Sequence, residues 1–366
     1  MSGLSTPHRR RSSLSGSSCS GTGGYTHYAL LSGAHPTLPL AEARAVVEAW
    51  GGEPGPYLEM LLLYNPPPGP RLLVEQTGMT REAGEALLVC EAAGIDYRLA
   101  AETIASRLPP GAQVRIEFTR LRGYARGVVD AASVVEGLAG ELRRLGATPT
   151  PRARYTARVI VVEGVALIGI LGYRRPRGFF EERRPHRKPF YKPGPLDPRL
   201  ARVFVNLSRP VPGMLYYDPF CGTAGFAVEA GLIGLRVACS DLDPEMAEGA
   251  PVNLDAYGVD YIAVVEADAR SQPVRGGAVD CIGTDPPYGR SIKVRGGATA
   301  EQLLSGFLRE AARVLKPCRH VAFAAPHWVD VDSLVAGAGL ELREKHYMRV
   351  HGGLTRILVV ARKRCG

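Results

Sequence analysis

The chain has 366 residues, 45% of them hydrophobic, which is enough for two or three domains that each bury a core. Its longest uncharged apolar stretch near the middle is residues 164–173. This is about half the length of roughly 20 residues that a membrane-spanning helix needs, so we do not expect the chain to span a membrane. Forty-five Lys and Arg against 36 Asp and Glu leave a net charge of +9, which favours a polyanionic partner, with nucleic acid as the first candidate.

The seven cysteines are odd in number and scattered, and no two of them form a C-x-x-C pair. This pattern favours free thiols in a reducing compartment over a disulfide framework, and it argues against a zinc site. We therefore expect a cytoplasmic protein with no bound metal.

Residues 1–24 are rich in serine, glycine and arginine, and no acidic residue precedes Glu42. Such a segment cannot bury enough apolar surface to offset the entropy of ordering it, so we expect a disordered tail. No apolar stretch follows the three arginines at 9–11, which argues against a secretory signal.

Residues 25–173 combine short apolar runs with helical periodicity, which predicts a small α+β region rather than one doubly wound sheet. The expected elements are a strand at 27–32, a helix at 40–50, strands at 57–64 and 72–75, a helix at 81–93, strands at 96–100 and 114–120, a helix at 131–145 and a hairpin over 159–173 that turns near Glu163.

Residues 174–195 form a basic linker, in which eight Lys and Arg stand against two acids and alternate with aromatic residues such as Phe179 and Phe190. Guanidinium groups pair with phosphates and aromatic rings stack on unpaired bases, so the segment suits a path along RNA. An ordinary solvated linker whose aromatic side chains pack on the next domain explains the composition equally well.

From residue 196 to 366 short apolar strands alternate with helices, a pattern typical of a mostly parallel sheet with helices on both faces. A Gly-Gly turn at 352–353 joins the last two strands, 342–351 and 355–361, into an antiparallel hairpin. The other expected strands are 214–218, 235–241, 262–266, 279–284 and 320–324, and the helices are 222–231, 244–257 and 300–315.

A glycine-rich turn, D-P-F-C-G-T-A-G over residues 218–225, follows the first of these strands and opens a helix. Gly222 and Gly225 remove side chains where a ligand would approach the backbone at the helix N-terminus. The turn lacks the Gly-Lys-Ser/Thr of a P-loop and the G-x-G-x-x-G spacing of dinucleotide sites. It favours cofactor binding over a purely structural turn.

Two further carboxylates follow the next two strands. Asp241 lies 23 residues after Asp218, where acidic residues of α/β sheets accept hydrogen bonds from ribose hydroxyls. It would otherwise cap the next helix, a role that Asp243 could fill instead. Asp268 follows the third strand, where it could accept a hydrogen bond from an adenine amino group.

The tetrad Asp285-Pro-Pro-Tyr288 follows the fourth strand. The prolines restrict the backbone so that the Asp285 carboxylate and the Pro286 carbonyl can converge on one small donor, beside the flat ring of Tyr288. An exocyclic base amine is a poor nucleophile, and accepting hydrogen bonds from both of its protons directs its lone pair toward the reacting carbon. A simple proline turn does not explain both flanking residues.

These motifs resemble those of class I S-adenosylmethionine-dependent methyltransferases that methylate amines. The segment RPHRKPFYKPGPLDPRLARVFVNLSR at 184–209, together with the two later motifs, is similar to archaeal tRNA (guanine-10 N2)-methyltransferases. The resemblance covers residues 184–316 densely and 26–175 thinly. It implies a Rossmann-like methyltransferase domain at 196–366, preceded by a ferredoxin-like and THUMP RNA-binding region.

Carried over by position, the resemblance implies a site for S-adenosylmethionine and a pocket for the target guanine. Asp285, Pro286 and Tyr288 would hold the guanine, and the segment 289–297 would close over it. Alanine stands at 224, where the family usually has glycine, and its methyl group costs little if the φ angle there is negative. The cofactor would be held by Asp218, Phe220, Gly222, Thr223, Gly225, Asp241 and Asp268, with Phe190 and Leu196 approaching the same pocket.

The resemblance implies tRNA as the partner and leaves open a small zinc-binding activator protein, as in eukaryotic relatives. The alternatives are methylation of another base amine, such as adenine N6, in tRNA or other RNA, and a non-catalytic RNA-binding protein. The expected phosphate contacts are Arg120, Arg122, Arg126, Arg152, Arg154, Arg158, Arg174, Arg175, Arg184 and Arg187.

Overall fold

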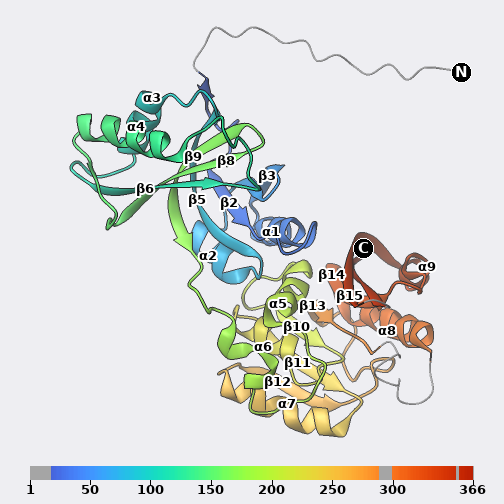
Figure 1. Cartoon of the computed structure of the whole chain (residues 1–366). Coiled ribbons are helices and arrows are strands. Elements are labelled where there is room, and N and C mark those ends of the chain that lie inside the picture. Colours follow the sequence, from blue (N-terminus) through green and yellow to red (C-terminus); the bar gives the residue numbers. More distant parts are fainter. Residues whose placement is uncertain (1–17, 288–298, 352–353, 366) are drawn as a thin grey trace, which may run out of the picture. The chain divides into compact units, whose positions relative to one another are not determined.

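The computed structural model describes residues 18–287, 299–351 and 354–365 (Figure 1). They divide into two compact units: unit 1 contains the described part of residues 1–24 with Ala86–Ile170, and unit 2 contains Tyr25–Glu85 with Leu171–Gly366. The expected region 25–173 is thus shared between both units. Most of the predicted tail, Tyr288, the segment 289–297 and the turn at 352–353 lie outside the described residues.

Unit 1 packs two helices on a small sheet. Asp96 and Asp130 cap these helices by accepting hydrogen bonds from backbone N–H groups of the first turn, which explains where each helix begins. Strand β6 pairs in parallel with β8, and β8 forms an antiparallel hairpin with β9. The elements are β1 (Cys19–Ser20), α3 (Tyr97–Ala105), β6 (Gln113–Arg120), α4 (Ala131–Arg144), β7 (Thr148–Pro149), β8 (Tyr155–Val162) and β9 (Val165–Arg174), the last of which runs on into unit 2.

The first part of unit 2 is an antiparallel sheet in the order β3-β4-β2-β5 with two helices. Helix α1 buries Val46 and Val47 against Leu62 of the sheet, in a core of its own. The elements are β2 (His27–Leu31), α1 (Leu38–Ala49), β3 (Glu53–Leu58), β4 (Leu61–Asn65), α2 (Pro70–Gln76) and β5 (Thr80–Glu91), and β5 continues into unit 1.

Three of the predicted elements have the wrong type, and the single strand expected at 57–64 is instead divided between the antiparallel strands β3 and β4. The helix expected at 81–93 is strand β5, and the strands expected at 72–75 and 96–100 belong to helices α2 and α3. Alanine and glutamate favour a helix in β5, but its pairing with β2 and β1 overrides this propensity. Pro70 in the first turn of α2 and the cap Asp96 of α3 are helix-start signals that outweigh the short apolar runs.

The second part of unit 2 confirms the predicted fold class. Its sheet has seven strands in the order β12-β11-β10-β13-β14-β16-β15, with the first five parallel and the last two forming the antiparallel hairpin. The strands are β10 (Leu215–Asp218), β11 (Arg236–Asp241), β12 (Tyr261–Glu266), β13 (Val279–Thr284), β14 (Leu315–Pro326), β15 (Leu340–His351) and β16 (Leu354–Lys363).

Helices cover both faces of this sheet. Side chains of α5, α6 and α7 share one core with the sheet, and those of α8 and α9 share the other. Residues 198–207 and 331–337 form helices that the sequence pattern did not predict. The helices are α5 (Pro198–Leu207), α6 (Gly225–Gly231), α7 (Pro244–Ala256), α8 (Ala300–Val314) and α9 (Val331–Gly337). No helix in the described part of the chain is long and apolar enough to cross a membrane.

The expectation that the cysteines are free thiols is wrong for four of them. Cys19 is bonded to Cys90, and Cys318 to Cys365, across 71 and 47 residues. The first pair meets because β1 and β5 place these two residues opposite each other in antiparallel register. Strand pairing brings together cysteines that look scattered along the sequence. Cys221, Cys239 and Cys281 are free and buried.

Candidate active site

Four aspartates gather where the parallel strands of unit 2 end. Asp218 and Asp241 are the last residues of β10 and β11, Asp268 follows β12, and Asp285 follows β13. These strands are neighbours in the order β12-β11-β10-β13. Because parallel strands end at the same edge of a sheet, their last residues lie along one edge, the usual place for ligands in open α/β sheets.

The turn between β10 and α6 contains two residues in the left-handed region. Gly222 has a φ of 48°, and Ala224, which is fully buried, has φ 60° and ψ 33°. The condition under which alanine would cost little at this position, a negative φ, is therefore not met. A left-handed alanine costs roughly 1–2 kcal/mol relative to its usual conformation, and the surrounding core must stabilise it.

Asp218 is fully buried at the end of β10. Its Oδ1 accepts hydrogen bonds from the Thr284 hydroxyl at 2.6 Å and from the Phe220 backbone N–H at 3.1 Å. Burial raises the pKa of this carboxyl to about 7. Its Oδ2 and the Thr223 hydroxyl are buried and have no hydrogen-bond partner among the described residues, so both suit a polar ligand.

Asp241 holds the glycine-rich turn in place. Its Oδ2 accepts a hydrogen bond from the Gly222 N–H at 2.8 Å, and its Oδ1 accepts one from the Asp243 N–H at 2.9 Å. Burial raises the pKa of Asp241, although these two donors oppose the shift. The cap of helix α7 is Asp243, whose side chain accepts from the Glu245 N–H, so Asp241 does not serve as the helix cap.

Asp268 forms an ion pair with Arg270, two residues further along the chain. Both of its oxygens contact the Arg270 guanidinium, at distances down to 2.6 Å, and Oδ1 also accepts from the Arg270 N–H. Hydrogen bonds from Arg270 lower the pKa of Asp268. A ligand at this position therefore meets an ion pair rather than an isolated carboxylate.

A cavity of about 340 Å³ joins these groups. Of the predicted cofactor residues, Asp218 and Phe190 are not part of its wall, and the Phe190 ring packs against Gly249 of α7 instead. Of the tetrad, Asp285 and Pro287 line the cavity, whereas the predicted site residue Pro286 is buried and is not part of the wall. The lining residues predicted from the sequence are Leu196, Phe220, Gly222, Thr223, Gly225, Asp241, Asp268 and Asp285.

The cavity wall is acidic. Its described part has four aspartates against two basic residues, Lys192 and Arg270, and Arg270 pairs with one of the aspartates. The aspartates are Asp241, Asp243, Asp268 and Asp285. Such a wall attracts a ligand that carries positive charge.

Asp285 has a partner that no local signal in the sequence indicates. Its Oδ2 lies 3.3 Å from Nη2 of Arg356 on β16, and both side chains are largely buried. The two residues are 71 positions apart, so only the return of the antiparallel hairpin to the parallel sheet brings them together.

Comparison with known proteins identifies the family. The model of the UPF0020 family, described as an RMKL-like methyltransferase domain, matches residues 185–357. The probable tRNA (guanine(10)-N2)-dimethyltransferase of Methanothermococcus thermolithotrophicus is 34% identical over 172 residues, which are 45% of this chain and 98% of that protein. This chain belongs to the tRNA (guanine(10)-N2)-dimethyltransferase family.

Two longer members of the family match a similar share of the chain. The tRNA (guanine(10)-N2)-dimethyltransferase of Methanothermobacter thermautotrophicus is 42% identical over 181 residues, and that of Methanocaldococcus jannaschii is 34% identical over 213. These matches cover 50% and 56% of this chain but only 53% and 57% of those proteins. The crystal structure of TrmN from Thermus thermophilus covers 93% of this chain and 100% of its own at 23% identity, with a TM-score of 0.48.

In this family member the basic linker packs inward. Phe180 is buried, and the guanidinium groups of four arginines lie within 6 Å of its ring centre. Arg183 and Arg202 both contact the buried Glu229, each at 2.7 Å. This arrangement agrees with the interpretation of the linker as a packed connection, at least over residues 175–183. The four arginines are Arg175, Arg183, Arg199 and Arg202.

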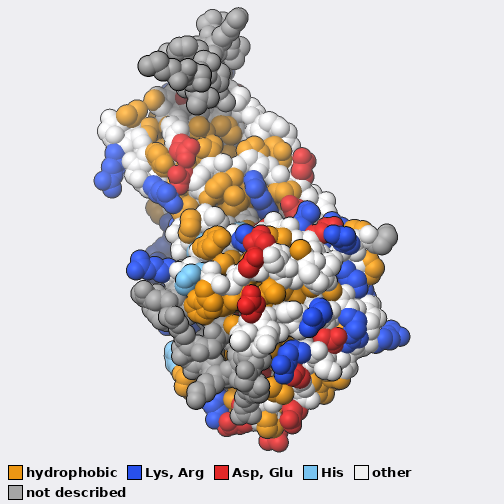
Figure 2. Space-filling model, turned by 90° about the vertical axis from the view of Figure 1, so that its right-hand side faces the viewer, with side chains coloured by type: hydrophobic (Ala, Val, Ile, Leu, Met, Phe, Trp, Pro, Cys, Tyr) orange, Lys and Arg blue, Asp and Glu red, His pale blue; other side chains and the backbone are white. Residues whose placement is uncertain are grey.

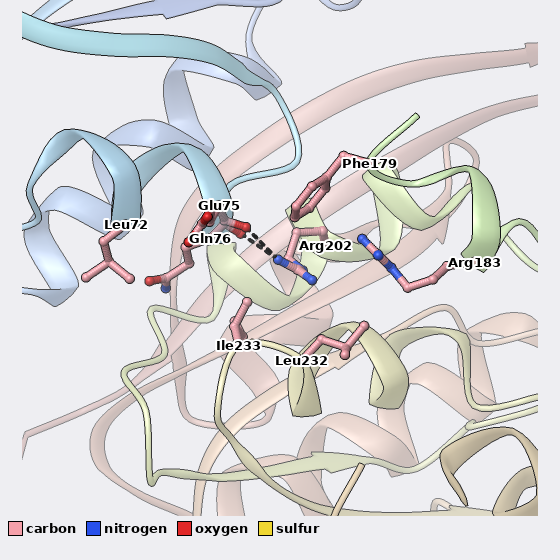
Figure 3. Close-up of a pocket in the computed structure, with 8 residues that line it drawn as sticks. All are labelled: Leu72, Glu75, Gln76, Phe179, Arg183, Arg202, Leu232 and Ile233. Atoms are coloured by element: carbon pink, nitrogen blue, oxygen red, sulfur yellow. Dashed lines mark hydrogen bonds between the residues drawn. The ribbon is translucent and has the colours of Figure 1, made fainter. Parts of the chain in front are cut away.

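A second cavity, of about 330 Å³, lies beside this cluster (Figure 3). Arg202 donates from Nη1 to the backbone carbonyls of Glu75 and Gln76 at the end of α2, each at 3.1 Å. The cavity is close in size to the first but lies away from the strand-end aspartates. We therefore place the candidate active site in the first cavity.

The arginines predicted to bind RNA fall into two groups. Arg158 is buried and pairs with Glu117 at 2.9 Å, and Arg175 donates to backbone carbonyls, including that of Thr80 at 2.8 Å. The structure thus removes these two from the predicted phosphate contacts, because their guanidinium groups hold neighbouring strands and turns together. Arg120 also donates to a backbone carbonyl, that of Val129.

The remaining arginines are more exposed. Arg174, Arg184 and Arg187 pair with glutamates but keep 41–48% of their side-chain surface accessible. On the face drawn in Figure 2, Lys and Arg side chains alternate with Asp and Glu rather than forming one continuous basic patch. The exposed members of unit 1 are Arg122, Arg126, Arg152 and Arg154.

Proposed function

We propose that this chain is an S-adenosylmethionine-dependent methyltransferase that acts on the exocyclic N2 amine of a guanosine in tRNA, of the position-10 type. The products would be N2-methylguanosine and N2,N2-dimethylguanosine. The observation that carries the proposal is the meeting of two motifs in one cavity: the glycine-rich turn with Asp241, and the start of the D-P-P-Y tetrad at Asp285. Family membership supports the reaction, and the names of the relatives support the substrate.

The residues of the cavity fit this cofactor. S-adenosylmethionine carries a positive sulfonium centre, which the acidic wall favours. The hydroxyl of Thr223 is a buried polar atom of the cavity wall that the methionine end would satisfy. Asp241 would accept from the ribose hydroxyls, and the pair of Asp268 with Arg270 would face the adenine. When bound, the cofactor supplies an electrophilic methyl group.

The chain's own contribution to transfer is to orient the amine. The Asp285 carboxylate and the Pro286 carbonyl would accept hydrogen bonds from the two N2 protons, so that the lone pair points at the reacting carbon. Tyr288 would stack on the base after the nucleotide leaves its helical stack. The amine proton departs to Asp285 or to water. No covalent enzyme intermediate is needed.

We assign tRNA recognition to unit 1, as a THUMP-type region. Its parallel β6-β8 pair, its two helices and its exposed arginines Arg122, Arg126, Arg152 and Arg154 support this role. Residues 25–85 would be the ferredoxin-like part. Because phosphate contacts dominate such binding, affinity for tRNA should fall steeply as salt concentration rises.

A zinc-binding activator protein would bind at the edge of the seven-stranded sheet, on strand β12. This strand is at the end of the seven-stranded order, and Ile262 and Val265 on it are exposed. An unpaired edge with apolar side chains can accept a strand from another protein. Action on tRNA would place the protein in the cytoplasm.

The decisive experiment is incubation of the full-length protein with labelled S-adenosylmethionine and an unmodified tRNA transcript, followed by nucleoside mass analysis and mapping of the position. We expect N2-methylated guanosine at position 10. Methylated adenosine at N6 would instead support the first alternative. Cofactor and tRNA binding without any product would support a non-catalytic RNA-binding protein.

Replacement of the tetrad aspartate provides the matched test of mechanism. We expect Asp285→Ala to reduce turnover by at least about 100-fold, since the amine loses an oriented acceptor, while cofactor affinity stays within a few-fold of wild type. Turnover and a cofactor titration measure the two effects separately. Asp332→Ala, in helix α9 and away from the cavity, is the control and should leave both unchanged. Wild-type turnover in Asp285→Ala would contradict the role.

A further inference from the structure

The ion pair between Asp285 and Arg356 links the end of a parallel strand to the antiparallel hairpin. Arg356 lies near the start of β16, opposite Pro326 of β14 and Met348 of β15. Strand β14 pairs in parallel with β13, whose end leads into Asp285. The guanidinium therefore reaches past one intervening strand to approach the Asp285 carboxylate at 3.3 Å.

Burial makes this pair different from the ion pairs on the surface. The accessible fractions are 11% for the Arg356 side chain and 16% for that of Asp285. An exposed pair is screened by water and orients its partners only weakly, whereas a largely buried pair is screened much less. Water therefore weakens the attraction between Arg356 and Asp285 less than it weakens that of the exposed pairs.

We propose that Arg356 is a positioning residue for the methyl-transfer site, which acts by fixing the plane of the Asp285 carboxylate. This inference rests on the function proposed above. Holding Oδ2 at the guanidinium determines the direction in which Oδ1 can accept a hydrogen bond from the target amine. Two acceptors must converge on one NH₂ group, so a free rotation of Asp285 would spoil the alignment with the Pro286 carbonyl.

The guanidinium has a second effect on the same carboxylate. A neighbouring positive charge favours the ionised form of an acid. An ionised Asp285 can only accept hydrogen bonds, whereas a protonated one would present a donor to the amine and compete with it.

The test compares Arg356→Met, Arg356→Lys and wild type under saturating cofactor with an unmodified tRNA transcript. We expect Arg356→Met to lower kcat by about 10- to 100-fold, while KM for tRNA and the Kd for cofactor stay within about twofold. Arg356→Lys keeps the charge and should recover part of kcat. Millimolar guanidinium should partly restore the activity of Arg356→Ala, which loss of a purely structural contact would not allow.

Arg343→Met is the matched control, because Arg343 lies on the neighbouring strand β15 and is 49% exposed. It should retain wild-type kcat. A raised KM for tRNA with unchanged kcat in Arg356→Met would show a phosphate contact and overturn the inference, as would full activity of this variant. If Arg356→Met does not fold, the lysine variant and guanidinium rescue still decide the question. If wild type itself makes no N2-methylguanosine, the proposed function fails rather than this inference.

Discussion

Two residues near the active site adopt arrangements that lower the stability of the folded protein. Asp218 is fully buried, with Oδ2 lacking a hydrogen-bond partner among the described residues, and Ala224 is held in the left-handed region. The methyl group of Ala224 is buried in the core, which offsets part of its backbone cost. Neither arrangement favours folding, and both occur where a ligand would approach the backbone. Backbone strain and buried polar atoms without partners are typical of functional sites.

Asp218 should make stability depend on pH in a defined direction. Its pKa is raised to about 7 in the folded protein, against about 3.9 for an unfolded aspartate. The folded state therefore binds more protons between these values, and the free energy of unfolding should fall as pH rises from about 4 to about 7 and then level off. The contribution is on the order of 4 kcal/mol at most.

Asp218→Asn removes this titration. We expect the difference in free energy of unfolding, wild type minus variant, to decline between pH 4 and 7. Urea unfolding at each pH measures it. Subtracting the variant cancels the titration of other groups. A difference that stays constant with pH, or rises, would contradict the raised pKa.

At the scale of helices and strands, buried ion pairs hold the linker and helices of unit 2 together. Glu229 of α6 contacts Arg202 of α5 and Arg183 of the linker, and Arg202 in turn donates to the end of α2. Burial lowers the pKa of Arg202, while Glu229 opposes the shift. Glu229 pairs with both arginines at 2.7 Å, so the effect of removing its charge should be large.

We expect Glu229→Gln to lower the free energy of unfolding by about 3–5 kcal/mol, because it leaves two largely buried arginines without their shared carboxylate. Asp332→Asn is the matched control: Asp332 pairs with Lys345 at the same distance, 2.7 Å, but the pair is exposed. Its effect should stay below about 1 kcal/mol. Equal effects of the two substitutions, measured by urea unfolding, would show that burial of the pair contributes nothing.

On the scale of the whole molecule, each unit contains one disulfide and unit 2 is built from two distant segments. Glu42 of α1 accepts from the Asn206 amide of α5 at 2.7 Å, across 164 residues. Arg202 adds its bonds to α2. A chain that begins after residue 171 would lose these partners, so the methyltransferase segment depends on residues 25–85 for stability.

The two disulfides should raise thermal stability measurably. They close loops of 71 and 47 residues, which corresponds to roughly 4 kcal/mol each in the chain-entropy model. We expect reduction to lower Tm, and the paired serine variants of Cys19 with Cys90 and of Cys318 with Cys365 to reproduce the loss separately. Alkylation of the unreduced, denatured protein should label three cysteines. Labelling of all seven would contradict both bonds.

The sequence alone determined the strands of residues 196–366, though not helices α5 and α9, and it determined the line of acids along the sheet edge. Alternating apolar runs specify parallel strands locally, and each strand end carries its own signal, as at Asp241 and Asp285. The sequence did not predict that β5 is a strand. Its alanine and glutamate residues favour a helix, but pairing with distant strands overrides this preference.

Only the tertiary structure decided which residues become partners across the chain. It joined Cys19 to Cys90, turned Arg158 and Arg175 inward, and brought Arg356 to Asp285. These contacts depend on sheet register and on strands returning from far along the sequence, and no local pattern encodes either. Local periodicity is a property of neighbouring residues, whereas the surroundings of a side chain depend on the packing of the whole fold.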